Sequence, residues 1–584
     1  MNLFEDIEAH IAACLDTLKS QGQLPADAQP VIEAETPRDP THGDVATNIA
    51  MVLAKPAKMK PRDIAALIAP LLEDHAEIAS VDIAGPGFIN MTMAPSYWAR
   101  VVLHVVNSGK DYGRLDIGKG QKTNVEYVSA NPTGPMHVGH CRGAVFGDAL
   151  ANLLAFAGYD VTREYYINDA GGQIAMLAKS VFLRYREALG EDIGAIPDGL
   201  YPGDYLVPVG QALAESHGAD LRDLPEHEWL PIISDTAIAA MLEMIKQDLA
   251  ALNISHDVFF SEASLKADGQ NRIAEAIEVL RAKDLIYEGR LEKPKGHADD
   301  EWEDREQTLF RSTQFGDDVD RALVKSDGSY TYFAADIAYH YDKLQRGYLH
   351  LINVFGADHV GYLKRMKSAV AALSDNKADF DIQVCQLVKL FRAGEPIKMS
   401  KRAGTFVTLR DVVDEVGADP VRYMMLYRKN DASLDFDFQK VTEQSKDNPV
   451  FYVQYAHARA ASVFRKAAEA FPGLDVSPSA LASADLSQID DPGEIDLVKM
   501  VARFPRMLQG AVRAHEPHRL AFYLYDLANA LHSQWARGND SPQLRFIHDN
   551  QGKTCARLAL LGAVQSVLST GLGILGVQAP DAMR

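Results

Sequence analysis

The sequence predicts an α/β protein in which a Rossmann-like parallel-sheet domain with insertions lies between an α+β N-terminal domain and an all-α C-terminal domain. Residues 1–112 alternate helix-like and strand-like stretches and end in a strand broken by Gly-Pro-Gly. Residues 113–444 contain a strand–turn–helix–strand unit of the kind that builds nucleotide-binding parallel sheets. Residues 445–584 have helical spacing almost throughout.

Length and composition are those of a multidomain globular protein. The chain has 584 residues, of which 47% are hydrophobic and 24% are charged. Its first residues carry acids where a signal peptide needs a basic start, and no run approaches the ~20 apolar residues of a membrane span. The four cysteines are scattered, without a CxxC pair. We therefore expect a cytoplasmic protein with no membrane contact and no structural zinc or other protein-held metal.

The net charge of −21 is unevenly distributed. Net charge is a weak test of nucleic-acid binding in a large chain, because binding depends on local patches. Residues 364–402 are rich in lysine and arginine with few acids, and basic and acidic residues are roughly balanced from about 446 onward. The chain is therefore compatible with an anionic partner.

The middle domain begins with the β-prone run NVEYVS, followed by the turn cluster PTGP and by a run with helical spacing that stops near Gly158. The next strand is VTREYYI. Residues from about 190 to 320 are interpreted as a substantial insertion. Strands then resume with LINVFGADH and DIQVCQLVKLF. This order predicts a parallel sheet interrupted by one long insertion.

The stretch ANPTGPMHVGHCRG places His137 and His140 around one glycine at a predicted helix start. A helix beginning near Val138 would point its free amide groups and positive dipole end toward the preceding loop. Gly134 and Gly139 would let a nucleotide approach the backbone, and both histidines would donate to phosphate oxygens. The competing interpretation is a plain helix start with two capping or solvent-facing histidines.

A second polar segment, EPIKMSKRAGTFVTL, spans residues 395–409 and carries Lys398 and Lys401 with Gly404 behind them. A mobile loop with two lysines can fold over a triphosphate and neutralise the leaving pyrophosphate. A solvated basic loop is the alternative. It is disfavoured because KMSK follows HVGH in the same chain, separated by the length of a parallel-sheet domain.

These two motifs carry a resemblance to a known class. HVGH resembles the HIGH signature, and KMSKR the KMSKS signature, of class I aminoacyl-tRNA synthetases. Within that class the chain resembles arginyl-tRNA synthetases from end to end, through HGDVATNIAMVLAK, SANPTGPMHVGH, YYINDAGGQI, VFGADHVGY, YAHARAASV and LGILGVQAPDAMR. Many members of that family have a degenerate KMSK, whereas this one is intact. A compensating basic residue near HIGH is therefore not expected here.

The resemblance implies that ATP reacts at the carboxyl edge of the sheet, with Mg2+ on its phosphates. His137, His140, Lys398 and Lys401 would stabilise the transferring charge. In FGADHVGY a strand ends in a glycine turn, so Asp358 and His359 are expected on the adenosine side, and an ordinary Asx turn at the strand end is the less favoured alternative. The full set of expected ATP contacts is Pro132, Gly134, His137, Gly139, His140, Asp358, His359, Met399 and Lys401.

A guanidinium is planar, always charged and best held by carboxylates in bidentate geometry. By resemblance, the arginine-contacting positions are Glu126, Asn131, Tyr332 and Asp336. Glu126 and Asp336 are assigned to the charged groups of the substrate and Asn131 to its amino-acid end. Tyr332 and Asp336 share one face if their segment is helical. Tyr332 is equally interpreted as a core or surface aromatic, whereas apolar neighbours would bury an unpaired Asp336 at a cost.

The N-terminal and C-terminal domains are both candidates for tRNA contact. The N-terminal domain resembles the additional domain that reaches the tRNA elbow, and its basic stretch KPAKMKPRD suits phosphates. The C-terminal domain resembles an anticodon-binding domain, in which Tyr452, Tyr455, His457 and Arg459 are tRNA contacts or, alternatively, core helix residues. In YYINDAGGQI, a turn with a helix cap explains the polar residues, which are not assigned to the site.

The resemblance implies an ATP-dependent arginine–tRNA ligase that forms arginyl-adenylate and transfers the arginine to the terminal adenosine of tRNA(Arg). It also implies that bound tRNA is needed for activation. A monomer is expected. Two alternatives stay open: a class I synthetase or adenylyltransferase for another substrate, and a catalytically silent tRNA-binding paralogue. Intact HVGH and KMSK disfavour the silent paralogue, which has no reason to keep that chemistry.

Overall fold

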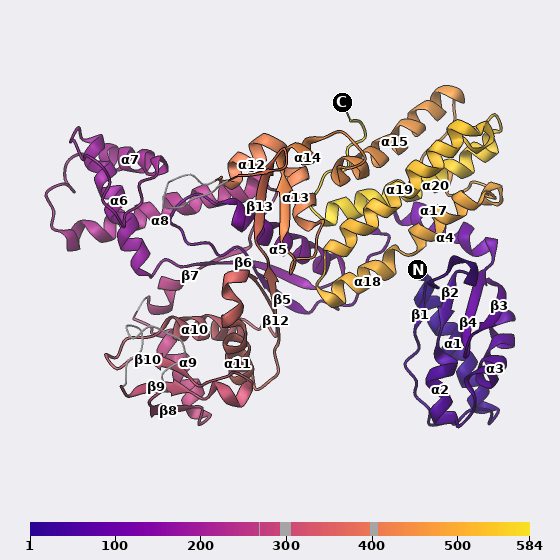
Figure 1. Ribbon diagram of the computed structural model, residues 1–584, viewed down its shortest axis with the longest axis horizontal. Helices are drawn as coiled ribbons and strands as arrows, with labels where there is room; N and C mark the ends of the chain where they lie inside the picture. The colour runs from indigo at the N-terminus through magenta and orange to yellow at the C-terminus, as the bar shows by residue number, and fades with distance from the viewer. Residues whose placement is uncertain (268, 292–304, 398–406, 584) are drawn as a thin grey trace. The chain divides into compact units, whose positions relative to one another are not determined.

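The computed structural model describes residues 1–267, 269–291, 305–397 and 407–583. It divides into two compact units (Figure 1). One unit combines Met1–Leu115 with Gln444–Arg584, and the other is Asp116–Glu443. These divisions fall within a few residues of the predicted boundaries after 112 and 444. The sequence pattern did not indicate that the two chain ends share one unit.

The N-terminal part of the first unit is an α+β layer. Its four-stranded antiparallel sheet has the order β1-β2-β4-β3. Helix α1 forms because apolar residues recur on one face, and Asn2 caps its first turn. The elements are α1 (Leu3–Ser20), β1 (Ala34–Glu35), β2 (Val45–Thr47), α2 (Ile49–Ala57), α3 (Pro61–Glu73), β3 (Ile78–Ala84), β4 (Phe88–Met93) and α4 (Pro95–Ser108).

The C-terminal part is entirely helical in the residues described. Figure 1 shows α15, α19 and α20 side by side, in orange to yellow, and these helices contact one another. The elements are α15 (Pro449–Ala470), α16 (Pro478–Leu481), α17 (Pro492–Ala502), α18 (Phe504–Ala514), α19 (His518–Asp540) and α20 (Gln551–Ile574).

Helix α20 is long and apolar enough, by length and composition, to cross a membrane. The sequence analysis expected no such segment. Two-thirds of its most apolar window is buried inside the unit (67%), and it packs on α15, α19 and α4. Its apolar character is thus explained by its place in the core of the helical layer.

Polar contacts join the two chain ends within their shared unit. The Tyr112 hydroxyl donates to the carbonyl of Val501 at 3.1 Å. Lys499 forms an ion pair with Asp44 at 2.7 Å. Helix α4 also packs against α20 and α17. These contacts place the two chain ends in one compact unit.

The middle unit is built on a five-stranded parallel sheet of order β12-β11-β5-β6-β7. The chain builds outward from β5 through β6 to β7, then returns to place β11 and β12 on the other side of β5. Ligands bind such sheets at the carboxyl ends of the strands where the order reverses. The elements are β5 (Lys122–Glu126), α5 (Val138–Phe156), β6 (Asp160–Ile167), β7 (Val258–Ser261), β11 (His350–Gly356) and β12 (Asp379–Cys385).

The sequence analysis expected one insertion at residues 190–320. The structure shows instead that this segment contributes a strand to the main sheet. Strand β7 lies inside it and pairs in parallel with β6, so the segment returns to the main sheet midway. Before β7, a helical layer with its own apolar core is formed by α6 (Gly172–Ala188), α7 (Val207–His217) and α8 (Glu226–Ala251). The short strand VFFS has no alternating pattern long enough to identify it from sequence.

After β7 comes a second layer with its own apolar core. Its antiparallel sheet has the order β10-β9-β8. The elements are α9 (Arg272–Ala282), β8 (Ile286–Gly289), β9 (Gln307–Phe310), β10 (Arg321–Val324), α10 (Tyr332–Gln345) and α11 (Leu363–Ser374). Helix α10 begins where Thr331 caps its first turn, as the predicted helical face of Tyr332 and Asp336 requires.

The middle unit ends with a second three-stranded sheet, of order β14-β13-β15. The run DIQVCQLVKLF, predicted as one strand, is divided between β12 in the main sheet and β13 in this one. The elements are β13 (Val388–Arg392), β14 (Glu395–Pro396), α12 (Leu409–Val416), α13 (Ala418–Leu426), β15 (Leu434–Asp437) and α14 (Phe438–Thr442).

Candidate active site

His137 and His140 together close the N-terminus of α5. The Nδ1 atom of His137 accepts a hydrogen bond from the backbone N–H of Gly139 at 3.0 Å. The Nδ1 atom of His140 accepts one from the backbone N–H of His137 at 3.3 Å, and the two rings stack with centroids 3.8 Å apart. The two histidines thus form a reciprocal capping box. The capping interpretation describes their local structure.

This capping also defines what the histidines can offer a ligand. An imidazole whose Nδ1 accepts a hydrogen bond carries its proton on Nε2 when neutral. Both neutral rings therefore carry their N–H donor on Nε2. Capping and donation to a phosphate oxygen use different atoms of the same ring, so the two interpretations of the motif are compatible.

The two glycines of the motif have neighbours of their own. A Cβ atom at Gly139 would lie 2.7 Å from Cε1 of His137, so glycine is required there by the capping ring. A Cβ atom at Gly134 would lie 2.9 Å from the hydroxyl oxygen of Tyr205. That hydroxyl donates to the carbonyl of Thr133 at 2.8 Å. In the structure Tyr205 therefore takes the space over Gly134, and Pro132, two residues earlier, is buried.

The backbone of the HVGH segment pairs with residues 407–409. His137 and Thr408 form an isolated antiparallel bridge. The N–H of Leu409 donates to the carbonyl of Met136 at 2.7 Å, and the N–H of Val138 donates to that of Val407 at 3.3 Å. The KMSK segment thus ends directly beside HVGH, although Lys398, Met399 and Lys401 lie outside the described residues.

Asp336 lies on α10, half-buried, with no ion pair among the described residues. Burial raises the pKa of its carboxyl to about 7, against the effect of a hydrogen bond from the Tyr362 hydroxyl. The nearby carboxylates Glu126 and Glu262 raise this pKa further. A carboxyl in these surroundings favours an incoming cation, because a cation would restore its charged form.

Glu126 lies at the carboxyl end of β5 and already has a cationic partner. The Nζ atom of Lys343 lies 2.6 Å from its Oε2 atom, and both side chains are buried. Lys343 also donates to Asn353 at 3.3 Å, and the Ser129 hydroxyl donates to the other Glu126 oxygen at 3.3 Å. The charge of Glu126 is therefore balanced within the fold, unlike that of Asp336.

Glu262 was missed by the sequence analysis. It begins a 3-10 turn, η4 (Glu262–Lys266), directly after β7. Burial raises the pKa of its carboxyl, and the nearby charge of Asp169 raises it further. Asp169 fixes the start of this turn by accepting hydrogen bonds from the Ser261 hydroxyl at 2.5 Å and the N–H of Ala263 at 2.8 Å. The NDAGGQ motif thereby holds a second carboxylate near Asp336.

Asn131 and Tyr332 are both exposed. The Asn131 amide donates to Gln173 at 3.0 Å, so ANPTGP and NDAGGQ meet at these two side chains. Tyr332 is the first residue of α10, and 75% of its surface is accessible. It is therefore not a core aromatic. Its placement one turn before Asp336 on the same helix is as the sequence predicted.

Asp358 and His359 lie at the carboxyl end of β11, in the 3-10 turn η7 (Ala357–Tyr362). Both are exposed, and the His359 Nε2 atom lies 3.5 Å from the Asp358 carboxylate. The Asp358 carboxylate folds back over Gly356, where a Cβ atom would lie 2.5 Å from it. This placement agrees with the predicted strand end.

In the C-terminal layer, Tyr452, Tyr455 and Arg459 lie on α15 and share His532 as a neighbour. The Arg459 guanidinium donates to Tyr455 at 3.1 Å and lies 2.8 Å from Nδ1 of His532. It also lies over the rings of Tyr455 and Trp535, at 4.5 and 4.7 Å. His457 is buried against the carbonyl of Pro580, so it belongs to the core.

Two further features of the N-terminal part concern charge. The basic residues of its KPAKMKPRD stretch are all exposed: Lys55, Lys58, Lys60 and Arg62.

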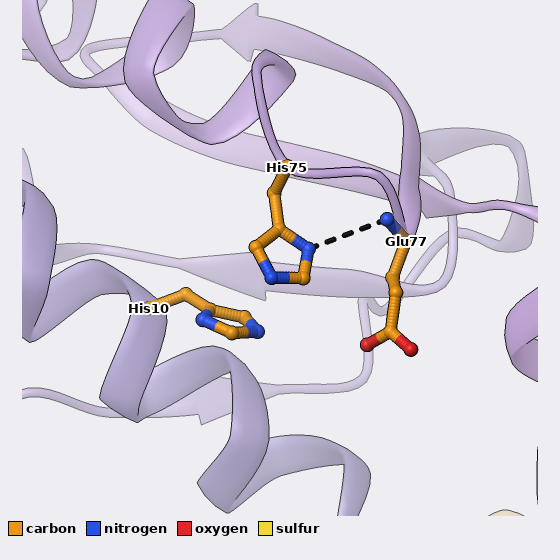
Figure 2. Close-up of side chains that lie close together, drawn as sticks. All are labelled: His10, His75 and Glu77. Atoms are coloured by element: carbon orange, nitrogen blue, oxygen red, sulfur yellow. Dashed lines mark hydrogen bonds between the residues drawn. The ribbon is translucent and has the colours of Figure 1, made fainter.

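Among the described residues, one group has metal-ligand spacing: His10, His75 and Glu77 (Figure 2). Arg100 pairs with Glu77 at 2.5 Å, and Nδ1 of His75 accepts the N–H of Glu77 at 3.3 Å. This group lies outside the unit that contains HVGH.

Comparison with known proteins identifies the family. Three family models match: the arginyl-tRNA synthetase N-terminal domain at 5–93, the class I (R) tRNA synthetase catalytic domain at 102–193, and the DALR anticodon-binding domain at 453–583. The arginine–tRNA ligase of Rhizobium etli is 60% identical over 100% of both chains. That of a Bradyrhizobium strain is 62% identical over 100% of this chain and 99% of the relative.

The same fold occurs in a solved structure. Thermus thermophilus arginyl-tRNA synthetase superposes with a TM-score of 0.74 over 100% of both chains at 22% identity, which establishes the likeness of fold. The relatives match end to end, and the N-terminal, catalytic and C-terminal models each match their own part of the chain. The chain belongs to the arginyl-tRNA synthetase family of class I.

Proposed function

We propose that this chain, as an ATP-dependent arginine–tRNA ligase, activates L-arginine at the carboxyl edge of the parallel sheet and transfers it to the 3′ terminal adenosine of its cognate tRNA. The observation that carries the proposal is Asp336, a half-buried carboxyl with a raised pKa and no ion pair among the described residues. It lies near a second such carboxyl, Glu262. Two carboxylates match the fork of a guanidinium better than the ammonium of lysine.

We assign the guanidinium to Asp336 and Glu262. Glu126 is a weaker candidate for it because Lys343 already balances its charge. We assign it, together with Asn131, to the α-ammonium group of the substrate. Tyr332, exposed one turn before Asp336, would cover the aliphatic part of the arginine side chain.

In the activation step, a carboxylate oxygen of arginine attacks the α-phosphorus of ATP in line. The bond from that phosphorus to the bridging oxygen breaks, and pyrophosphate leaves. The Nε2–H groups of His137 and His140, with the N-terminus of α5, would donate to the phosphate oxygens as charge develops. Positioning and electrostatics suffice, and no side chain becomes a covalent nucleophile.

Of the other predicted ATP contacts, we retain those of the KMSK segment and of the turn after β11, but not Gly134, because Tyr205 takes the space over it. Lys398, Met399 and Lys401 belong to the segment that ends beside HVGH, and Asp358 with His359 would meet the adenosine side at the end of β11. Mg2+ enters with the phosphates of ATP as part of the substrate. The described residues near HVGH contain no group of three with metal-ligand spacing.

We assign tRNA contact to the exposed side of the cluster formed by Tyr452, Tyr455 and Arg459. Stacking of splayed bases on aromatic and guanidinium planes is the usual way in which proteins read single-stranded RNA. Transfer then proceeds when a hydroxyl of the terminal adenosine attacks the carbonyl of arginyl-adenylate and AMP leaves.

We further propose that the enzyme acts as a monomer in the cytoplasm, where its cysteines, unpaired among the residues described, stay reduced.

The test is arginine-dependent exchange of pyrophosphate into ATP, with and without cognate tRNA and with lysine as the competing amino acid. Exchange with arginine supports the proposal, and exchange only when tRNA is added establishes a tRNA requirement for activation. Exchange with lysine instead would favour a class I synthetase for another amino acid. Folded protein that binds tRNA without any exchange would be a silent binding module.

A further inference from the structure

Tyr362 lies between the two halves of the site. It is the last residue of η7, the turn that carries Asp358 and His359. Its hydroxyl donates to the Oδ2 atom of Asp336 on α10. One side chain therefore joins the predicted nucleotide turn to the predicted guanidinium carboxylate. These two regions are otherwise contributed by different segments of the chain.

The ring of Tyr362 is held in place on more than one side. The Arg365 guanidinium lies 4.7 Å from its centroid, and the ring of Phe333 meets it edge-on at 6.0 Å. A tyrosine restrained in this way transmits a shift at its hydroxyl to its backbone, because the ring has little freedom to turn.

We propose that Tyr362 is a positioning residue that couples arginine occupancy to ATP binding. Its hydroxyl aims Asp336 at the guanidinium, and its backbone ends the turn that meets the nucleotide. A bound guanidinium would increase the negative charge on Asp336 and strengthen the hydrogen bond from Tyr362. The turn would then be held in one conformation when ATP arrives, which lowers the cost of ordering it.

This inference rests on the proposed function, since it assumes that arginine occupies the pocket beside Asp336. Coupling between two ligands is reciprocal, so it is measurable from either one. The inert analogue α,β-methylene-ATP allows both ligands to be present without reaction. The coupling factor is the dissociation constant of the analogue without arginine, divided by its value at saturating arginine.

We expect a coupling factor of at least about fivefold in the full-length wild-type protein. In Tyr362→Phe, which removes one oxygen, the factor should fall to below about twofold, while the analogue still binds alone with wild-type affinity. The matched control is Tyr330→Phe, which removes a hydroxyl bonded to Asn271 at 2.9 Å in the same layer. It should retain the wild-type factor.

The pH profile separates positioning from a general loss of structure. The charged groups that face Asp336 are Glu126 from β5, Glu262 from η4 and Arg365 from α11, with the Tyr362 hydroxyl from η7. Arginine should bind more weakly as the pH falls below about 7, because the Asp336 carboxyl takes up a proton there. Without the Tyr362 hydroxyl, the inflection should move upward by roughly half to one pH unit.

The outcomes are distinct. Unchanged coupling and an unchanged pH inflection in Tyr362→Phe would overturn the inference, as would a wild-type coupling factor of one. Loss of coupling together with a large drop in melting temperature, shared by Tyr330→Phe, would also overturn it, because the effect would then be one of folding. Failure of the wild-type protein to bind arginine at all would instead remove the proposed function.

Discussion

The backbones of His137 and Thr408 pair in an antiparallel bridge, so the start of helix α5 and the end of the segment 395–409 are fixed to each other. The contact involves main-chain atoms and does not depend on which side chains the loop carries. The bridge thereby anchors the chain at Thr408 to the start of helix α5.

Leu409→Pro tests the anchor. Leu409 is the first residue of α12, where proline is tolerated, and its N–H donates to Met136 at 2.7 Å. The substitution removes that hydrogen bond and should lower the rate of pyrophosphate exchange roughly tenfold at saturating arginine. Leu409→Ala is the control because Leu409 is buried. It loses apolar contact but keeps the N–H, and an equal loss of rate in both variants would contradict the prediction.

Asp336→Asn should raise the Michaelis constant for arginine strongly, by an amount equivalent to ~2–5 kcal/mol. The amide removes the negative charge that the guanidinium would meet while keeping the size of the side chain. Steady-state exchange kinetics measure the constant, and Asp327→Asn, in an exposed turn, is the matched control. A constant unchanged from wild type would remove Asp336 from the pocket.

The same substitution should stabilise the fold at alkaline pH. The folded-state pKa of Asp336 is raised to about 7 from 3.8. A carboxyl with a raised folded pKa contributes stability that is present below its unfolded pKa and lost as the pH rises through the folded value. Asp336→Asn should therefore melt at a higher temperature than wild type at pH 8, with a smaller difference at pH 5. A difference that does not depend on pH would contradict this.

Lys343→Met should be destabilising because it leaves Glu126 buried without its partner. Breaking a buried ion pair from one side costs on the order of 3–5 kcal/mol. Adding Glu126→Gln should recover most of that loss, since no uncompensated charge then remains. Urea unfolding of the wild type, both single variants and the double variant measures the coupling. Additive losses would show that the two charges do not interact.

Local patterns predicted much of the fold and part of the site. The helix start at HVGH, the strand end at Asp358 and the shared helix of Tyr332 and Asp336 each depend on neighbours within a few residues. Such features follow from capping, turn chemistry and helical spacing. For these features the sequence prediction and the structure agree.

Contacts between distant segments could not be predicted in the same way. Nothing near Glu126 in the sequence indicates that Lys343 will balance its charge. Glu262 stands alone after a short strand, and only the fold brings it near Asp336. Tyr205, which takes the space over Gly134, comes from a stretch with no motif. Each of these depends on which layers the insertions pack against, and spacing along the chain does not encode that.

The sharing of one unit by Met1–Leu115 and Gln444–Arg584 has a consequence for biosynthesis. During translation the middle unit, Asp116–Glu443, is complete before any residue of the C-terminal part has been made. Domains generally fold as units as they emerge from the ribosome. The face of α4 that packs against α17 and α20 therefore stays uncovered until the C-terminal part has been synthesised. Truncated chains that stop short of α15 should expose that face and be prone to aggregate.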